Sequence, residues 1–263
     1  MLIRLLFLLA FGVAAAAPAA ADAQARTGRA APSAGFTARD RADFERGLLS
    51  GPGAPFYLAI RRNFPAEYQG LLGRMMTIAM ANRRNLRAAL PLILRETVAT
   101  FRSLAPYVAS APNEPLLRVL QSHVDMYVAA QRIDPALCAR LATEGSAPGV
   151  SLPGGLNQLA AATTSSLIDA AGAGRRAPVT GRQPLSAEER AQVRAMLAQV
   201  DQQGDLSALF ADGTALLNTA TPDQQCRFVI ALNQVIGRLP PDMAGRAAAE
   251  MLVDQLRMIP DPS

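Results

Sequence analysis

Two cysteines, Cys138 and Cys226, are the residues of this chain whose chemistry follows most directly from their type and number. Two thiols in a folded protein tend to form a disulfide in an oxidising compartment and stay reduced in the cytosol. A bridge between them would close a loop of about 90 residues and stabilise the fold by about 4.5 kcal/mol in the chain-entropy account. We therefore predict an intramolecular disulfide; two buried free thiols and a bond to a second molecule are the alternatives.

His123 is the only histidine of the chain. Zinc sites usually combine histidines, cysteines and acids at short spacings, and neither an H-E-x-x-H motif nor such a cluster occurs in the sequence. A histidine that acts as a general base needs a nucleophile beside it, but the chain has no G-x-S-x-G turn. Because His123 falls at the edge of the apolar stripe of a predicted helix, we interpret it as packed at the rim of the core. We predict no catalytic residue, no metal site and no cofactor, and we favour a protein that is not an enzyme.

Two glycine pairs, Gly70 with Gly73 and Gly172 with Gly174, come nearest to a phosphate-binding loop. Such a loop follows a strand, and a P-loop carries a lysine, whereas this chain contains no lysine at all. Close packing of helices explains both pairs better, so we do not expect nucleotide binding.

Glu96 is the one acidic residue on a largely apolar predicted helix, which is where an acid that cleaves sugar polymers would be sought. Sugar-binding clefts usually offer aromatic faces, however, and the chain has no Trp and 4 Tyr. We interpret Glu96 as a solvated ion-pair partner of Arg95 or Arg102. An envelope hydrolase or lyase with an unrecognised acidic site is kept as an alternative function.

Positive charge is concentrated in the first half of the chain. From Arg26 to Arg132 there are 15 Arg and 7 acidic residues, a balance of +8, whereas the residues from 133 onward have 10 Arg and 13 acidic residues, a balance of −3. Two clusters stand out in the basic half, and they consist of Arg61, Arg62, Arg83, Arg84 and Arg87. This region could contact anionic lipid, lipopolysaccharide or an acidic envelope protein. Ordinary solvated arginines at helix ends are the plainer interpretation.

The N-terminal residues indicate export. Arg4 supplies a positive charge, residues 5–17 are apolar or small, and Ala-x-Ala sites follow Pro18, an order that is typical of a secretory signal peptide. As a helix, the apolar run would reach roughly 20 Å, short of the roughly 30 Å of a bilayer core, which disfavours a retained anchor. An Ala-rich and Arg-rich composition without Lys is typical of GC-rich bacterial genomes. We expect a periplasmic protein of a Gram-negative bacterium, with secretion beyond the cell as the alternative; nucleic acid is not an expected partner there.

Most of the remaining chain has apolar residues at every third or fourth position, which predicts amphipathic helices. Capping residues and prolines mark their expected starts near Thr37, Pro65, Leu86, Asn113, Pro135, Asn157, Ser186, Asp205, Pro222 and Asp242. No alternating β-branched run beside an Asn-Gly or Asp-Gly turn is present. The predicted fold is all-α, an irregular bundle of about 8–10 helices.

Composition divides the chain further. We expect a signal peptide (1–25), a disordered N-terminus (26–35), an N-terminal helical bundle (36–171), a linker (172–185) rich in Gly, Arg, Pro and Thr, and a C-terminal helical subdomain (186–263). The expected function is a non-enzymatic binding, adaptor or assembly module of the cell envelope that presents a groove or a basic face. A peripheral membrane or lipid-associated protein using the region from Arg61 to Arg87 is the second hypothesis. The sequence does not predict an oligomeric state.

Overall fold

A computed structural model of the chain describes residues 37–51, 53–83, 85–143, 152–201, 204, 206, 209 and 220–259. Within these residues the regular structure is α-helical and no strand occurs, which confirms the all-α prediction. The predicted signal peptide, the segment 26–35 and most of the helix expected to start near Asp205 lie outside the described residues. Those expectations stay predictions.

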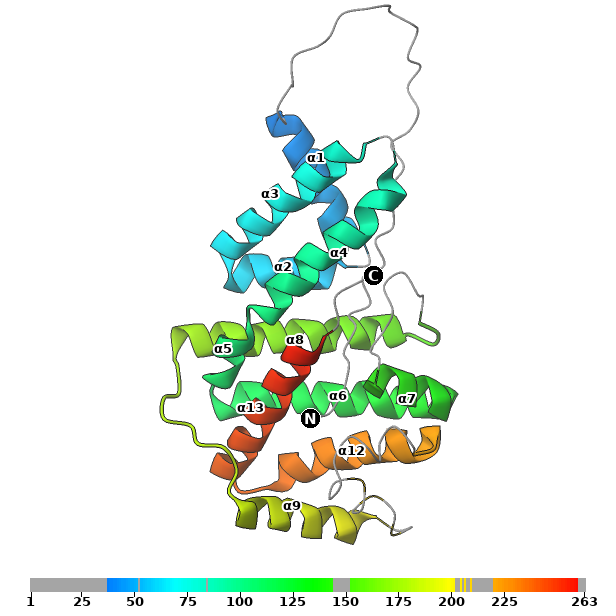
Figure 1. The fold of residues 1–263 in the computed structure, drawn as a ribbon, viewed down its shortest axis with the longest axis vertical. Coiled ribbons are helices and arrows are strands. Elements are labelled where there is room, and N and C mark those ends of the chain that lie inside the picture. The colour runs from blue at the N-terminus through cyan, green and yellow to red at the C-terminus, as the bar shows by residue number, and fades with distance from the viewer. Residues whose placement is uncertain are drawn as a thin grey trace, which may run out of the picture.

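The first four helices lie together at one end of the molecule (Figure 1). They are α1 (Ala38–Ser50), α2 (Ala54–Asn63), α3 (Pro65–Ala81) and α4 (Leu86–Arg102). Thr37 and Asp40 form a capping box that begins α1, as the sequence suggests. Helix α2 was not predicted, because it is short and no side chain caps its start. Its stability comes from tertiary packing, since it buries Phe56, Tyr57 and Ile60 and lies against the later helix α8 (Leu156–Arg176).

The sequence predicts a single helix start, near Leu86, between residues 86 and 112, but the structure has two helices there. Helix α4 ends at Arg102, and a short helix α5 (Ala105–Ala109) follows it. Pro106 explains the break, because it has no N–H to donate to the carbonyl of Arg102 and its ring would clash there. Pro91, in contrast, is accommodated inside α4.

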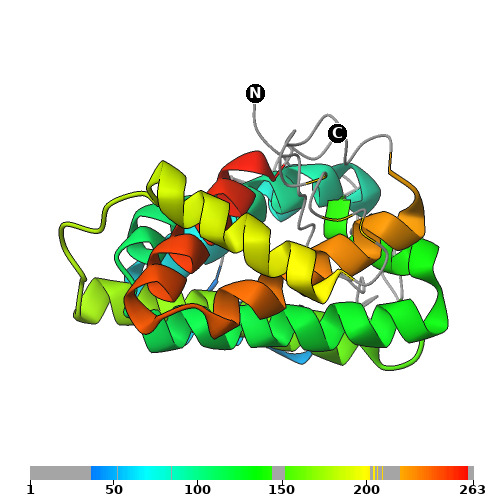
Figure 2. The same cartoon turned by 90° about the horizontal axis from the view of Figure 1, so that it is seen from below.

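Four helices form successive layers in the rest of the molecule (Figure 1). Helix α6 (Asn113–Ile133) lies between α8 and α12 (Pro222–Arg238), and α9 (Ala187–Val200) packs on the outer side of α12. Helix α7 (Pro135–Thr143) lies against α6 and α12, and α13 (Pro241–Met258) crosses α5 and α6. Figure 2 shows α9 lying across the surface formed by α12 and α13. Helix α6 is therefore the centre of the fold, and its buried face includes Leu116, Val119 and Val124.

Helix α8 continues to Arg176, so the first part of the expected linker 172–185 is helical. Gly172 and Gly174 of α8 allow close contact between this helix and the neighbouring residues of α2 and α5. A Cβ on Gly172 would lie 2.2 Å from Asn63 Oδ1, and a Cβ on Gly174 would lie 1.9 Å from the carbonyl oxygen of Tyr107. Composition alone cannot distinguish such contact glycines from linker glycines, and this is why the predicted boundary was five residues early.

Residues on both sides of the expected linker contribute to one continuous hydrophobic core, because α12 and α13 pack against α5, α6 and α7. The division of the chain into two helical parts stays a prediction. Among the described helices, none has both the length and the apolar character needed to cross a membrane.

Candidate functional site

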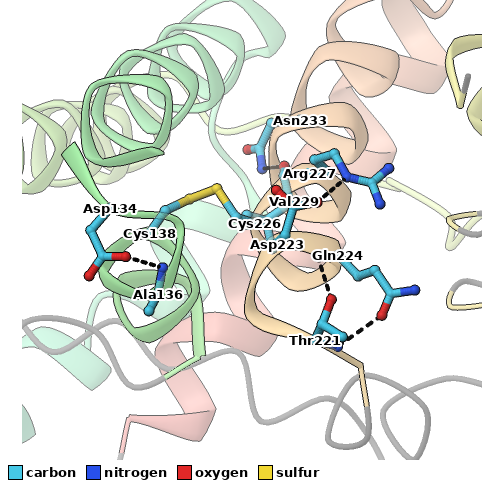
Figure 3. The surroundings of a disulfide bond; sticks show 10 residues. All are labelled: Asp134, Ala136, Cys138, Thr221, Asp223, Gln224, Cys226, Arg227, Val229 and Asn233. Atoms are coloured by element: carbon cyan, nitrogen blue, oxygen red, sulfur yellow. Dashed lines mark hydrogen bonds and ion pairs between the residues drawn. A yellow bond between two sulfur atoms is a disulfide. The ribbon is translucent and has the colours of Figure 1, made fainter. Parts of the chain in front are cut away.

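The structure brings Cys138 and Cys226 together at one end of the α6 and α12 layers (Figure 3). Their Sγ atoms lie 2.02 Å apart and their Cα atoms 5.5 Å apart, and both side chains are fully buried. Each cysteine follows a capped helix start. Asp134 Oδ1 accepts from the amide of Ala136 at 2.9 Å, and the capping box that begins α12 joins Thr221 to Gln224. The disulfide joins α7 to α12 inside the core, which is the arrangement of a structural disulfide.

His123 lies in the middle of the molecule and is 1 % exposed, so the expected position at the rim of the core was wrong. Helix α12, packing on α6, covers the edge of the apolar stripe on which His123 lies. Its ring centroid is 6.0 Å from that of Tyr127, and Asn233 of α12 forms a hydrogen bond with it. Burial lowers the pKa of His123 to about 3, although the hydrogen bond with Asn233 acts in the opposite direction. The imidazole is therefore neutral at physiological pH.

The space beside His123 is too small for a substrate. A cavity of about 10 Å³ lies between His123, Thr163 of α8 and Gln255 of α13, enough for about one water molecule. The nearby hydroxyls bond to the protein itself, since Thr163 Oγ1 donates to the carbonyl of Ser122 at 3.1 Å and Thr164 Oγ1 to that of Ala160 at 2.9 Å. This enclosed polar cluster fixes how α6, α8, α12 and α13 fit together.

Glu96 forms an ion pair with an arginine of the neighbouring helix. Its Oε2 lies 2.6 Å from Arg74 Nε, so the expected partners Arg95 and Arg102 were wrong. Residues one or six positions apart on a helix do not face each other, whereas α3 lies alongside α4 and presents Arg74 to it. The Glu96 side chain is 30 % exposed and is held by this pair. The geometry is that of an ion pair between α3 and α4, two neighbouring helices.

The predicted basic region is divided into two groups by helix α3. Arg61 Nη1 lies 3.6 Å from Glu45 Oε1, and Arg62 Nη2 lies 2.6 Å from Asp169 Oδ1, so both charges of the first group are paired. Arg83 and Arg87 are exposed at the far end of α3, a helix of 17 residues that spans about 25 Å. Arg84 lies outside the described residues. We call the exposed α3–α4 end, with Met80, Arg83 and Arg87, the basic tip.

An open groove of about 530 Å³ lies where the segment 177–185 passes the first turns of α6 and α13. This volume is in the range of small-molecule binding sites. In Figure 1 the segment leaves α8 and runs along the side of the molecule to the start of α9. We call this site the Arg182 groove, and its polar lining consists of Asn113, Thr180, Arg182, Gln183, Asp242 and Arg246.

Hydrogen bonds hold the segment 177–185 against the helices. The amide of Val179 donates to the carbonyl of Ser110 at 2.8 Å, and the amide of Leu185 donates to Glu250 at 3.4 Å. Gly181 has φ +70°, a left-handed conformation that other residues rarely adopt and that turns the segment toward the groove residue Arg182. These hydrogen bonds fix the position of the segment 177–185, which forms one wall of the groove.

Arg182 is the partly buried cation of the groove. Its Nη2 donates to the carbonyl of Ala111 at 2.7 Å and to Asn113 Oδ1 at 3.0 Å. Its Nε and Nη1 are buried, and the described part of the chain supplies no acceptor for either. Burial lowers the pKa of Arg182, while the charge of Asp242 raises it. A guanidinium nevertheless stays protonated at physiological pH.

Arg246, the second cation of the groove, is neutralised within the protein. Its Nη1 donates to Glu189 Oε2 at 2.9 Å, a second contact joins Nη2 to the other oxygen of Glu189, and Nε lies 3.2 Å from Asp242 Oδ2. The hydrogen bonds from Arg246, with one from the backbone of Ser186, lower the pKa of Glu189 to about 2. Arg182 differs, because no described carboxylate lies within 4.0 Å of it.

This groove could not be predicted from the sequence. Asn113 was expected to cap α6, but Pro112 takes the capping position and the Asn113 side chain bridges Arg182 and the carbonyl of Pro241 at 2.9 Å. Gly245 makes this bridge feasible, since a Cβ there would lie 1.9 Å from Asn113 Oδ1. Arg182 was assigned to the linker 172–185, and the residues beside it in the sequence predict only a turn.

A scan against protein-family models finds no match to this chain, and neither does a search of curated proteins or of solved structures.

Proposed function

We propose that this protein is an exported, non-enzymatic binding module of the bacterial cell envelope, and that the Arg182 groove is its ligand-binding site. The observation that carries the proposal is an open groove of about 530 Å³ whose wall holds a partly buried arginine with no described carboxylate within 4.0 Å of it. Binding sites combine a concave surface with a few polar groups held in place by the scaffold. The Arg182 groove has this form.

The scaffold supports a binding role. Helices α6 and α13 present the groove with their first turns, and the same helices pack into the core through α12 and α5. The buried Cys138–Cys226 pair ties α12 at its other end. Such a bond forms in an oxidising compartment, which supports the proposed periplasmic location; secretion beyond the cell would suit it equally.

A photo-crosslinking amino acid placed in the groove tests this function. We expect the Gln183 position, in the groove, to give a covalent adduct on irradiation of intact cells, detected by the intact mass of the purified protein. The same amino acid at Gln199, exposed on α9, is the matched control and should give none. No adduct at Gln183, or equal adducts at both positions, would contradict the proposed function.

The basic tip favours a second candidate function, attachment to an anionic membrane surface. Met80 is 37 % exposed beside the exposed Arg83, and Leu92 of α4 is 37 % exposed beyond Arg87. Exposed apolar side chains next to arginines are typical of proteins that lie on anionic lipid. Flotation with phosphatidylglycerol vesicles at low salt should then recover the protein, and an Arg83→Gln/Arg87→Gln variant should not float. Absence of flotation by the unmodified protein would exclude this function.

A further inference from the structure

Arg182 has hydrogen-bonding capacity that the described protein does not use. Two of its five N–H groups are accounted for by the carbonyl of Ala111 and by Asn113, whereas Nε and Nη1 have no acceptor. A partly desolvated charge is costly unless acceptors or a counter-charge compensate it. Natural proteins rarely leave such groups unsatisfied, and a functional role or a bound ion is among the explanations when they do.

We propose that the Arg182 groove binds the oxyanion of a small ligand, either a carboxylate or a phosphate group, with Arg182 as its anchor. This inference rests on the proposed binding function and adds the chemical class of the ligand. Both Nη2 hydrogens are already donated, so the ligand would be attracted by the guanidinium charge and would accept single hydrogen bonds from the remaining donors. Thr180 and Gln183 are exposed on the groove wall and offer further donors to the same ligand.

Two features of the groove restrict the ligand. Asp242 lines the groove, with its side chain 88 % exposed, so its negative charge repels an anion and disfavours ligands of high negative charge. The Nε and Nη1 atoms of Arg182 are covered by protein atoms, so binding requires a small local shift of the covering groups. The groove volume also exceeds that of a bare ion, so we expect the oxyanion to belong to a larger molecule.

Titration calorimetry at low ionic strength and pH 7 tests the inference, with sodium phosphate and sodium succinate as separate probes. We expect at least one probe to bind, and Arg182→Gln to weaken that binding by at least about tenfold. Asp242→Asn should strengthen it by about two- to threefold, because a repelling charge is removed. Arg95→Gln, which removes one exposed arginine of α4 outside the groove, is the matched control and should leave binding unchanged.

The outcomes distinguish a phosphate from a carboxylate ligand, and they distinguish failure of the oxyanion inference from failure of the proposed binding function. Binding of phosphate alone assigns a phosphorylated ligand, and binding of succinate alone assigns a carboxylate; either result supports the inference. It is overturned if neither probe binds at millimolar concentration, or if Arg182→Gln, shown to be folded by its thermal denaturation, binds as well as the unmodified protein. If Arg182→Gln does not fold, an unchanged affinity of Asp242→Asn overturns it. A Gln183 crosslink without any anion binding would preserve the proposed function and reject only this ligand class.

Discussion

His123 and Arg182 are two basic side chains placed in opposite kinds of surroundings. His123 is enclosed between four helices beside a cavity of about 10 Å³, whereas Arg182 lines an open groove of about 530 Å³. The histidine responds to burial by losing its charge, because its pKa falls to about 3. The arginine cannot do so at physiological pH and keeps a charge with donors to spare. The enclosed site therefore fits a role in stabilising the fold, and the open site is the one that we propose for a ligand.

Removing the disulfide should give the largest effect on the enclosed site. Cys226 lies on α12 about 10 Å along the helix from Asn233, the partner of His123, so the bridge anchors the helix that carries Asn233. We expect Cys138→Ala/Cys226→Ala to lower the free energy of unfolding by about 4.5 kcal/mol, measured by urea denaturation. Unmodified protein with and without reductant is the control. Equal stability of both proteins under oxidising conditions would contradict this role.

Gly174→Ala should give the next largest effect, on the groove side. The new Cβ would lie 1.9 Å from the carbonyl oxygen of Tyr107 and 2.9 Å from the amide nitrogen of Ala111, whose own carbonyl accepts from Arg182. Because the obstacle is backbone, we expect destabilisation of about 3 kcal/mol, the upper end of the overpacking range. The control is Gly73→Ala in α3, which meets nothing within 4 Å and should stabilise by up to about 1 kcal/mol. Equal effects of the two changes would refute the close approach of α8 to α5.

Acidification should test the neutral state of His123. A free histidine has a pKa near 6.5, and the folded value is about 3, so the unfolded chain binds the proton first. The stability due to neutral His123 is complete above about pH 6.5 and is lost as the pH falls toward 3. Between pH 7 and pH 5 we expect the free energy of unfolding to fall by about 2 kcal/mol. Urea denaturation of His123→Gln should lack this fall, and an identical pH dependence in both proteins would show that His123 is not buried as described.

Glu189 should give the smallest effect, since its ion pair with Arg246 is partly exposed. Its pKa is lowered to about 2 from an ordinary value of 4.5, so the pair stabilises the fold above pH 4.5 and this contribution is lost as the pH falls toward 2. Thermal denaturation between pH 5 and pH 3 should show a shallower decline for Glu189→Gln than for the unmodified protein. Glu188→Gln, the adjacent acid of the same turn, should decline as the unmodified protein does. If the stability of Glu189→Gln falls between pH 5 and pH 3 as steeply as that of the unmodified protein, the ion pair of Glu189 with Arg246 does not stabilise the fold.

The helices were predictable from the sequence to the extent that local signals determine them. The capping residues Thr37, Ser186 and Thr221 mark the starts of α1, α9 and α12 where they were expected. Helix α2 and the end of α8 were not predictable in this way, because packing against other helices decides them. The hydroxyl residues 163–166 have low helix propensity, yet they lie within α8, and one of them, Ser166, bonds across to Ser122 of α6 at 2.9 Å.

The two polar sites were harder to predict than the helices. The sequence places His123 on an apolar face, but the packing of α12 that encloses it joins residues far apart in the chain. The groove depends on contacts between Asn113, Arg182 and α13, which have no local pattern. The cysteines were the exception, because two cysteines allow a single intramolecular pairing and the expected export of the chain favours that bond.

The nitrogen-15 spectrum of the arginine side chains tests the central claim most directly, because it observes the Nε–H group of Arg182. We predict that sodium phosphate or sodium succinate shifts this resonance, assigned by its loss in Arg182→Gln, and leaves that of the exposed Arg95 in place. An Arg182 resonance that stays unchanged up to millimolar anion would contradict an oxyanion site in the groove.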